Sequence, residues 1–295
     1  MGLERYKEPG RRPPRAAYAL PTLFTAGNVF LGFLAVVKSF EGAMLAASQT
    51  PGAERHFELA AKAIGVAVFL DGLDGRIARM TNTTSEFGRE IDSLADVISF
   101  GIAPAVLGLA WGIFFVQPAA GMLARGQLLT AGYFFSFLFL LCGAARLARF
   151  NVTKNPVPKN PGRPDRKYFV GLPIPAAAGM VAAVVYAAGC EPVTHWALSV
   201  GFLGLLALLS FLMVSTWRYY SFKDVSLLRP RSPLTLILLG SLIYLVWHYS
   251  EAVLLAMAVT YVGSGIAVRV GGILRRHWRA APHEAERQVG SGSSA

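Results

Sequence analysis

Long apolar stretches alternate with short charged stretches along the chain. A helix needs about 20 residues to cross the hydrocarbon core of a bilayer. Eight stretches reach or approach that length, at about 20–37, 60–80, 94–116, 128–147, 170–189, 196–217, 234–249 and 251–268. The last two are short and meet at His248–Glu251, which indicates a tight helical hairpin. The pattern predicts an all-α, polytopic integral membrane bundle of about eight transmembrane helices.

The positions of the basic residues predict the orientation of this bundle. With the N-terminus in the cytoplasm, only Lys38, Arg55, Lys62 and Arg125 of the 28 Lys and Arg residues fall in outside segments. Cytoplasmic segments of membrane proteins are enriched in Lys and Arg. We therefore expect both termini in the cytoplasm and the protein in the cell (inner) membrane. Three regions follow: a basic cytoplasmic segment (1–19), a membrane-embedded domain (20–270) and a cytoplasmic C-terminal tail (271–295).

Composition supports a membrane protein and argues against a nucleic-acid partner. Only 15% of the residues are charged and 54% are hydrophobic, whereas about 25% are charged in soluble domains. The net charge of +11 comes from basic residues at the ends of apolar stretches, with no interleaved aromatic patch. Such residues serve as membrane anchors and contact membrane lipids. Cys142 and Cys190 lie far apart in apolar stretches, so they indicate neither a disulfide framework nor a metal site.

Four aspartates break the apolar pattern at the cytoplasmic ends of the second and third predicted helices. Asp71 and Asp74 are three residues apart on one helix, and Asp92 and Asp96 are four residues apart on the next. Both spacings place a pair on one helical face. Two neighbouring antiparallel helices would therefore direct four carboxylates at one point.

Such a cluster predicts bound divalent cations. Converging carboxylates repel one another, and Arg79 alone cannot neutralise them. Ligand sets made only of oxygen suit Mg²⁺, Mn²⁺ or Ca²⁺, and two bridged metals can clamp a phosphoryl group. A single aspartate such as Asp74 could merely be solvated in a loop, but four on matched faces favour a metal site. Intramembrane aspartates also mark cation transporters, which place them near the bilayer centre, often in paired repeats. No such repeat is evident here.

The segment Asp71–Arg79, together with Gly88, Asp92 and Asp96, resembles the signature of the CDP-alcohol phosphatidyltransferase family, D-x-x-D-G-x-x-A-R-x8-G-x3-D-x3-D. All eight fixed positions are present at the family's spacing. The resemblance implies a membrane enzyme that displaces CMP from a CDP-linked lipid with an alcohol. It also implies a two-metal centre, with Asp96 as the base that deprotonates the alcohol. The metal ligands it implies are Asp71, Asp74, Asp92 and Asp96, and the residues that bind the CDP-lipid are Asn28, Gly75, Ala78, Arg79, Ser85 and Gly88.

Further stretches are similar to the phosphatidylserine synthase branch of this family. They are Leu20–Asn28, Ser93–Ala105, Leu141–Val152 and Gly171–Pro175, and the similarity covers most of residues 20–190. One departure is Thr22, where related sequences commonly have Asn. The resemblance implies CDP-diacylglycerol and L-serine as substrates, phosphatidylserine and CMP as products, and a homodimer. Glycerol 3-phosphate or an inositol phosphate remains an alternative acceptor.

Two arginines at the end of the fourth predicted helix are candidates for binding serine. Arg146 and Arg149 are three residues apart, and Phe150 and Asn151 follow. Guanidinium groups bind carboxylates through two parallel hydrogen bonds. Arginines at a cytoplasmic helix end are also simple membrane anchors, and physical reasoning leaves the two roles open. The resemblance favours contact with serine by all four residues.

Overall fold

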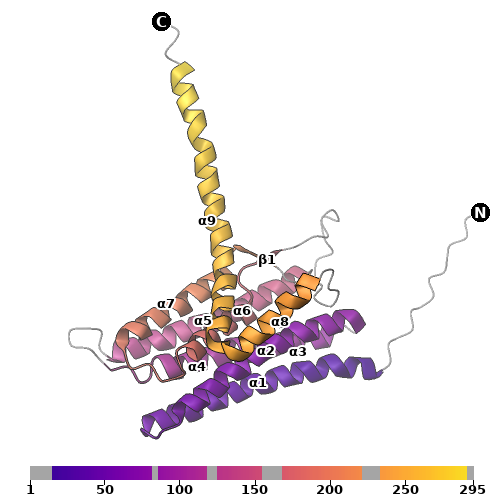
Figure 1. Cartoon of the computed structure of the whole chain (residues 1–295), viewed down its shortest axis with the longest axis vertical. Coiled ribbons are helices and arrows are strands. Elements are labelled where there is room, and N and C mark those ends of the chain that lie inside the picture. Colours follow the sequence, from indigo (N-terminus) through magenta and orange to yellow (C-terminus); the bar gives the residue numbers. More distant parts are fainter. Residues whose placement is uncertain (1–14, 82–85, 118–124, 155–167, 221–232, 291–295) are drawn as a thin grey trace, which may run out of the picture.

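The computed structural model describes residues 15–81, 86–117, 125–154, 168–220 and 233–290, and it is mostly helical. Figure 1 shows the described helices gathered in a bundle from which the long C-terminal helix projects. The helices are α1 (Arg15–Ala47), α2 (Ala53–Thr81), α3 (Glu86–Asp96), the π-helix η1 (Val97–Ile102), α4 (Ala103–Gly112), α5 (Arg125–Lys154), α6 (Ile174–Ala187), α7 (Trp196–Val214), α8 (Pro233–His248) and α9 (Ser250–Gly290).

Five segments of these helices are long and apolar enough to cross a membrane. They are Leu23–Ala47, Glu90–Gly112, Arg125–Val152, Trp196–Val214 and Ser250–Arg269. Their presence identifies the chain as an integral membrane protein. The predicted number of eight crossings and the cytoplasmic location of both termini stay predictions. Helices α6 and α8 have only 14 and 16 residues, and α2 carries several charged residues.

Helices α1 and α2 form a hairpin that supports one side of the bundle. The turn between them is possible because Gln49 and Gly52 adopt positive φ angles of 55° and 106°. Close packing near the turn depends on Gly42, because a Cβ atom there would lie 3.1 Å from the ring of Phe57. That ring is fully buried. The hairpin thus fixes the direction in which α2 carries Asp71 along the bundle.

The structure corrects two predicted segments. The predicted helix at 170–189 begins only at Ile174, and two short antiparallel strands are present in a chain predicted to be all-α. Strand β1 (Tyr168–Val170) pairs with β2 (Arg218–Tyr220), with Phe169 opposite Tyr219. Strands of three residues are too short to show an alternating pattern. The predicted helix at 94–116 is interrupted by η1 and ends at Gly112.

A glycine turn connects this β-ribbon to the membrane helices. The N–H of Gly171 donates to the carbonyl of Trp217 at 2.8 Å, and the N–H of Leu172 donates to the carbonyl of Leu212 at 3.0 Å. Gly171 has a φ of +79°, and a Cβ atom there would lie 2.5 Å from the carbonyl oxygen of Met213. Only glycine meets both conditions. The ribbon is thereby fixed at the ends of α6 and α7.

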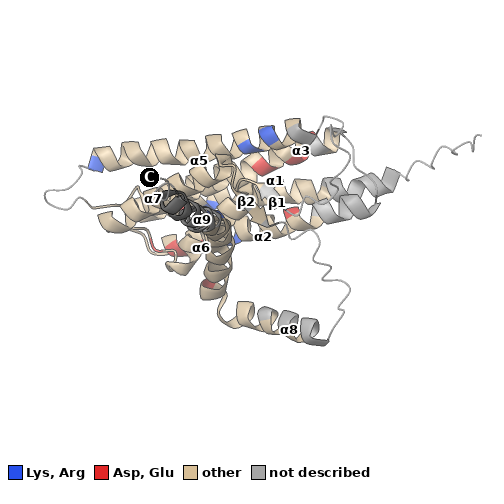
Figure 2. Ribbon diagram, turned by 90° about the horizontal axis from the view of Figure 1, so that it is seen from above, with Lys and Arg blue, Asp and Glu red and all other residues tan. Residues whose placement is uncertain are grey.

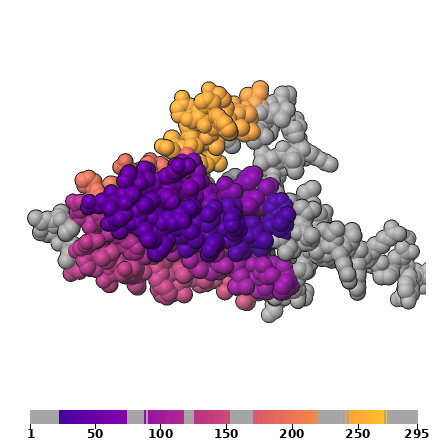
Figure 3. Space-filling model, turned by 90° about the horizontal axis from the view of Figure 1, so that it is seen from below, coloured from indigo at the N-terminus to yellow at the C-terminus, as the bar shows by residue number. Residues whose placement is uncertain are grey.

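The last two helices meet as predicted but differ in their packing. Only Tyr249 separates α8 from α9. In Figures 2 and 3, α8 stands away from the bundle, whereas the first part of α9 lies against it. Helix α9 continues to Gly290, so the predicted tail begins as an extension of this helix. Residues 291–295 lie outside the described part of the chain.

Candidate active site

Three of the predicted carboxylates converge at one end of the bundle. Asp71 on α2, together with Asp92 and Asp96 on α3, contributes carboxylate oxygens that all lie within 4.8 Å of one another. Figure 2 shows acidic residues gathered around α3 at this end. Asp71 is half-buried. The geometry suits a hard divalent cation, because every ligand atom is an oxygen.

The fourth predicted ligand, Asp74, belongs to helix α2 one turn beyond Asp71. Its side chain lies outside the described part of the structure, as do the side chains of Ala78 and Arg79; the surroundings of Gly75 are not described either, and Ser85 lies outside the described part altogether. Gly88 is exposed on α3, one turn before Asp92 on the same face. The structure thus brings three of the four predicted ligands together.

The π-helix η1 begins directly after Asp96 and is fixed between two helices. Its Ser99 hydroxyl donates to the carbonyl of Asn28 on α1 at 2.8 Å. A Cβ atom on Gly32 of α1 would lie 2.7 Å from the Cα atom of Ser99, and one on Gly101 would lie 2.8 Å from Cδ1 of Leu140. Short π-helical segments inside helices frequently occur at functional sites. Here the segment determines where α3 ends and hence where Asp96 is held.

Asn28 adjoins this contact, and its side chain is fully buried. Neither its amide nitrogen nor its amide oxygen has a hydrogen-bond partner within the described residues. A buried polar group without a partner costs about 1–3 kcal/mol, which makes packing a poor explanation for an asparagine here. An amide in this position can donate to and accept from a bound polar ligand.

The residues predicted to bind serine have different partners in the structure. Arg146 interacts electrostatically with Asp96 and Tyr261, and its Nε atom is buried with no hydrogen-bond partner in the parts of the chain described. Arg149 is exposed and donates to the carbonyl of Val214 at the end of α7, at 3.4 Å. The amide of Asn151 donates to Ser93 Oγ at 2.8 Å. Of these residues, Arg146 is the one with an electrostatic interaction with a carboxylate of the cluster, Asp96.

The half-buried side chain of Phe150 lies between Arg149 and Asn151 near the end of α5. The segment also connects α5 to two other helices. Arg149 hydrogen-bonds to the end of α7, and Asn151 hydrogen-bonds to α3.

Sequence reasoning missed two tyrosines near this end of the bundle. Tyr219 on β2 is fully buried, and its ring centre lies 5.9 Å from that of Tyr261 on α9. Burial raises the pKa of the Tyr219 hydroxyl to about 12, so it stays protonated at neutral pH. Neither tyrosine lies in a motif, and both follow the acidic segment by more than a hundred residues. For Tyr261, the sequence offers only a polar ring within a mostly apolar stretch, 252–268.

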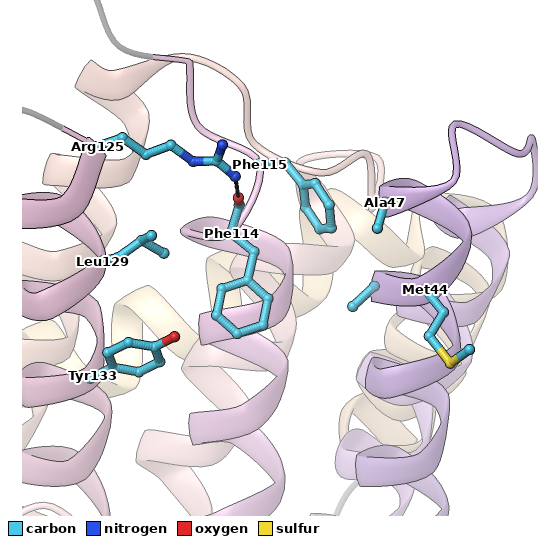
Figure 4. A pocket seen from close by; sticks show the side chains of 8 residues that line it. Met44, Ala47, Phe114, Phe115, Arg125, Leu129 and Tyr133 are labelled. Carbon is cyan, nitrogen blue, oxygen red and sulfur yellow. Dashed lines mark hydrogen bonds between the residues drawn. The ribbon is translucent and has the colours of Figure 1, made fainter.

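A separate cleft of about 370 Å³ lies at the other end of α5 (Figure 4). Arg125 at its rim donates to the carbonyl of Phe114 at 3.1 Å, and Met44, Phe115 and Tyr133 contribute to its lining. Arg125 and Arg146 belong to the same helix, so the cleft is about 30 Å from the carboxylates at 1.5 Å per residue. It is therefore not part of the carboxylate site.

Comparisons with known proteins agree with this geometry. The sequence profile of the CDP-alcohol phosphatidyltransferase family matches residues 18–211. A CDP-diacylglycerol–serine O-phosphatidyltransferase of Helicobacter pylori is 38% identical over 213 residues, which cover 72% of this chain and 76% of the relative. A protein of the same name from Saccharomyces cerevisiae is 37% identical over 159 residues, covering 54% of this chain and 50% of the relative.

An archaeal relative extends the comparison. An archaetidylserine synthase of Methanothermobacter thermautotrophicus is 35% identical over 162 residues, covering 54% of each chain. The family profile includes Asn28, the acidic segment and Arg146, whereas Tyr219 and Tyr261 lie beyond its end.

Proposed function

Because this chain belongs to the CDP-alcohol phosphatidyltransferase family of enzymes, we propose that it transfers the phosphatidyl group of CDP-diacylglycerol to the hydroxyl of L-serine. The products are phosphatidylserine and CMP, so the enzyme acts in phospholipid biosynthesis. The convergence of Asp71, Asp92 and Asp96 within 4.8 Å is the observation that carries this proposal. The names of the relatives support serine as the acceptor.

Divalent cations fit the carboxylate site, because it offers several oxygen ligands and no nitrogen or sulfur ligand among the described residues. Asp71, Asp92 and Asp96 would hold two Mg²⁺ or Mn²⁺ ions together with Asp74. Bound there, the ions would stabilise negative charge on the phosphates and on the departing CMP. The remaining steps depend on side chains of this chain.

Asp96 acts as the base in the proposed reaction. Its carboxylate takes the proton from the serine hydroxyl, and the serine oxygen forms a bond to the β-phosphorus of CDP-diacylglycerol. The bond from this phosphorus to the oxygen of the CMP phosphate breaks, and CMP leaves with that electron pair. Catalysis therefore consists mainly of positioning and electrostatic stabilisation, as in phosphoryl transfer generally.

Further residues of the family signature, with Asn28 and Arg146, would bind the two substrates. The buried amide of Asn28 binds the CDP portion of the lipid, together with Gly75, Ala78, Arg79, Ser85 and Gly88. Arg146 binds the serine carboxylate, because a guanidinium matches a carboxylate with two hydrogen bonds. Its electrostatic interaction with Asp96 supports this role, because serine bound at Arg146 would then have its hydroxyl near the base.

The proposed setting is the cell membrane, with both termini and the carboxylates on the cytoplasmic side. An even number of crossings, such as eight, would put both termini on the same side. The distribution of basic residues supports this arrangement. CDP-diacylglycerol would then enter sideways from the bilayer while serine comes from the cytosol. The resemblance to the family also supports a homodimer.

Purified protein supplied with CDP-diacylglycerol, labelled L-serine and Mg²⁺ or Mn²⁺ tests the proposal. We expect labelled phospholipid and CMP in equal amounts. Transfer to glycerol 3-phosphate or an inositol phosphate, with none to serine, would overturn the assignment of serine as the acceptor but keep the proposed class of reaction. Cation transport without release of CMP would remove the enzymatic proposal.

The role of Arg146 has a matched test on the same helix. Arg146→Gln removes the guanidinium that faces Asp96, and we expect at least a ten-fold rise in the KM for serine, because hydrogen bonds to charged groups contribute about 1.5–3 kcal/mol. Arg125→Gln, at the other end of α5, should leave this KM unchanged. Equal KM values in the two variants would contradict carboxylate binding by Arg146.

A further inference from the structure

The buried hydroxyl of Tyr219 has no role in packing. The side chain is fully buried, and the hydroxyl has no hydrogen-bond partner in the regions the structure describes. A phenylalanine would fill the same space without burying an unsatisfied hydroxyl, which is a cost that native proteins rarely accept. Binding of a polar ligand would explain the hydroxyl.

Two contacts fix the position of the Tyr219 ring. Pairing of β2 with β1 places Tyr219 opposite Phe169. On the other side, α9 approaches so closely that a Cβ atom on Gly265 would overlap the ring. The ring therefore lies beside Tyr261, with ring centres 5.9 Å apart and planes inclined by 38°. The β-ribbon and α9 thus bring two phenol rings together.

The second tyrosine extends this pair toward the catalytic end of the molecule. Tyr261 interacts electrostatically with Arg146, which in turn interacts with Asp96. The ring contact and these two electrostatic interactions therefore relate Tyr219 on β2, Tyr261 on α9 and Arg146 on α5 to Asp96 on α3. Tyr219, Tyr261 and Arg146 combine two neutral hydroxyl donors with one cation, beside the proposed base. Such a set of donors matches a carboxylate.

We propose that Tyr219 and Tyr261 complete a carboxylate pocket around Arg146 and thereby select amino-acid acceptors over alcohols that lack a carboxylate. This inference rests on the proposed transfer to serine. The two hydroxyl groups donate hydrogen bonds to the serine carboxylate and orient the serine hydroxyl toward Asp96. Tyr219 and Tyr261 thus determine specificity for the acceptor, and neither takes a proton in the reaction.

The variants Tyr219→Phe and Tyr261→Phe test this pocket by removing one oxygen each while keeping the ring. We expect each to raise the KM for L-serine roughly ten-fold, because a hydrogen bond to a charged group is lost. The KM for CDP-diacylglycerol and the kcat should change less than about two-fold. Tyr133→Phe removes the hydroxyl of an exposed tyrosine at the opposite end of α5 and is the matched control.

A second acceptor separates recognition of the carboxylate from general damage. Serinamide keeps the hydroxyl and the amine of serine but has no carboxylate. Each Phe variant should therefore lose kcat/KM with serine, whereas its kcat/KM with serinamide should stay at the wild-type value, which is already lower than that for serine. Equal losses with both acceptors, or no change in the KM for serine, would overturn the inference. If Tyr219→Phe does not fold, Tyr261→Phe carries the test.

The failure of this inference can be told apart from failure of the proposed function. Wild-type protein that transfers nothing to serine would remove the proposed function itself. Wild-type protein that uses serine, with both Phe variants matching it in the KM for serine, would remove only the carboxylate pocket.

Discussion

At one end of the bundle, acidic side chains pair with basic side chains. At the other end, they cluster with one another. Near the α1–α2 turn, Glu41 lies 2.6 Å from Lys38 Nζ and 2.8 Å from His56 Nδ1. Two residues beyond His56 on α2, Glu58 pairs with Lys62 one helical turn further on. Glu41 and Glu58 each have a lysine beside them, so electrostatics favours the folded state, although exposed pairs contribute little.

At the catalytic end, Asp71, Asp92 and Asp96 converge within 4.8 Å. Two unit charges at this separation repel by roughly 3 kcal/mol at an effective dielectric constant of about 20. Stability alone does not account for such a cluster. The contrast supports the proposed binding of a dication at the second end, and substitutions at the two ends should therefore have different effects.

The largest expected effect comes from the proposed base. Asp96→Asn removes the group that accepts the serine proton, and loss of a general base lowers rates by about 10²–10⁴-fold. We expect this loss in kcat for CMP release, with CDP-diacylglycerol binding still measurable. Glu58→Gln, an acid from the paired end, should stay within about two-fold of wild type. Asp96→Asn protein that retains more than a tenth of the activity would remove the assignment of the base.

Membrane helices and the acidic site could be predicted from local sequence. A chain in lipid must satisfy its backbone hydrogen bonds internally, so long apolar stretches become helices. The positions of Asp71, Asp92 and Asp96 followed from spacings of a few residues within one helix. The convergence of the two helices followed from the short connection between them.

Features that depend on distant contacts could not be predicted. The π-helix after Asp96 is fixed by contacts of Ser99 and Gly101 with two other helices, and its own sequence is simply apolar. Strands β1 and β2 lie almost fifty residues apart and exist only as a pair. Tyr219 and Tyr261 come together through that ribbon and through α9. Local sequence does not show that these two residues are neighbours, because their proximity depends on the tertiary structure.

A glycine substitution beside the π-helix should have an intermediate effect. Gly32→Ala would place a Cβ atom 2.7 Å from the Cα atom of Ser99, and the close atom is backbone that cannot rotate away. We expect destabilisation of about 1–3 kcal/mol and a lower kcat, because η1 positions Asp96. Thermal unfolding in detergent and CMP release measure the two effects.

The control for this substitution is Gly65→Ala on α2, where nothing lies within 4 Å of an added Cβ atom. Alanine favours a helix over glycine by up to about 1 kcal/mol, so this variant should be as stable as wild type or slightly more stable. Indistinguishable behaviour of the two alanine variants would contradict the tight contact between α1 and η1.

The smallest expected effect belongs to the paired end. Glu41→Gln removes one carboxylate from its contacts with Lys38 and His56. Partly exposed ion pairs contribute little, so the unfolding midpoint should fall by no more than about 2 °C and the activity should not change. Added salt should reduce the difference further. A large loss of activity would show that this end also serves catalysis, which would remove the contrast between the two ends.

Binding of Mn²⁺ to the purified protein tests the central claim most directly. Titration of metal-depleted wild-type protein, followed by the electron paramagnetic resonance signal of free Mn²⁺, should reveal two bound ions per chain, and Asp71→Asn should weaken their binding at least ten-fold. Serine transfer should disappear with a chelator and return with the metal. Equal Mn²⁺ binding by the two proteins, or full activity in the chelator, would contradict a dication site built on Asp71, Asp92 and Asp96.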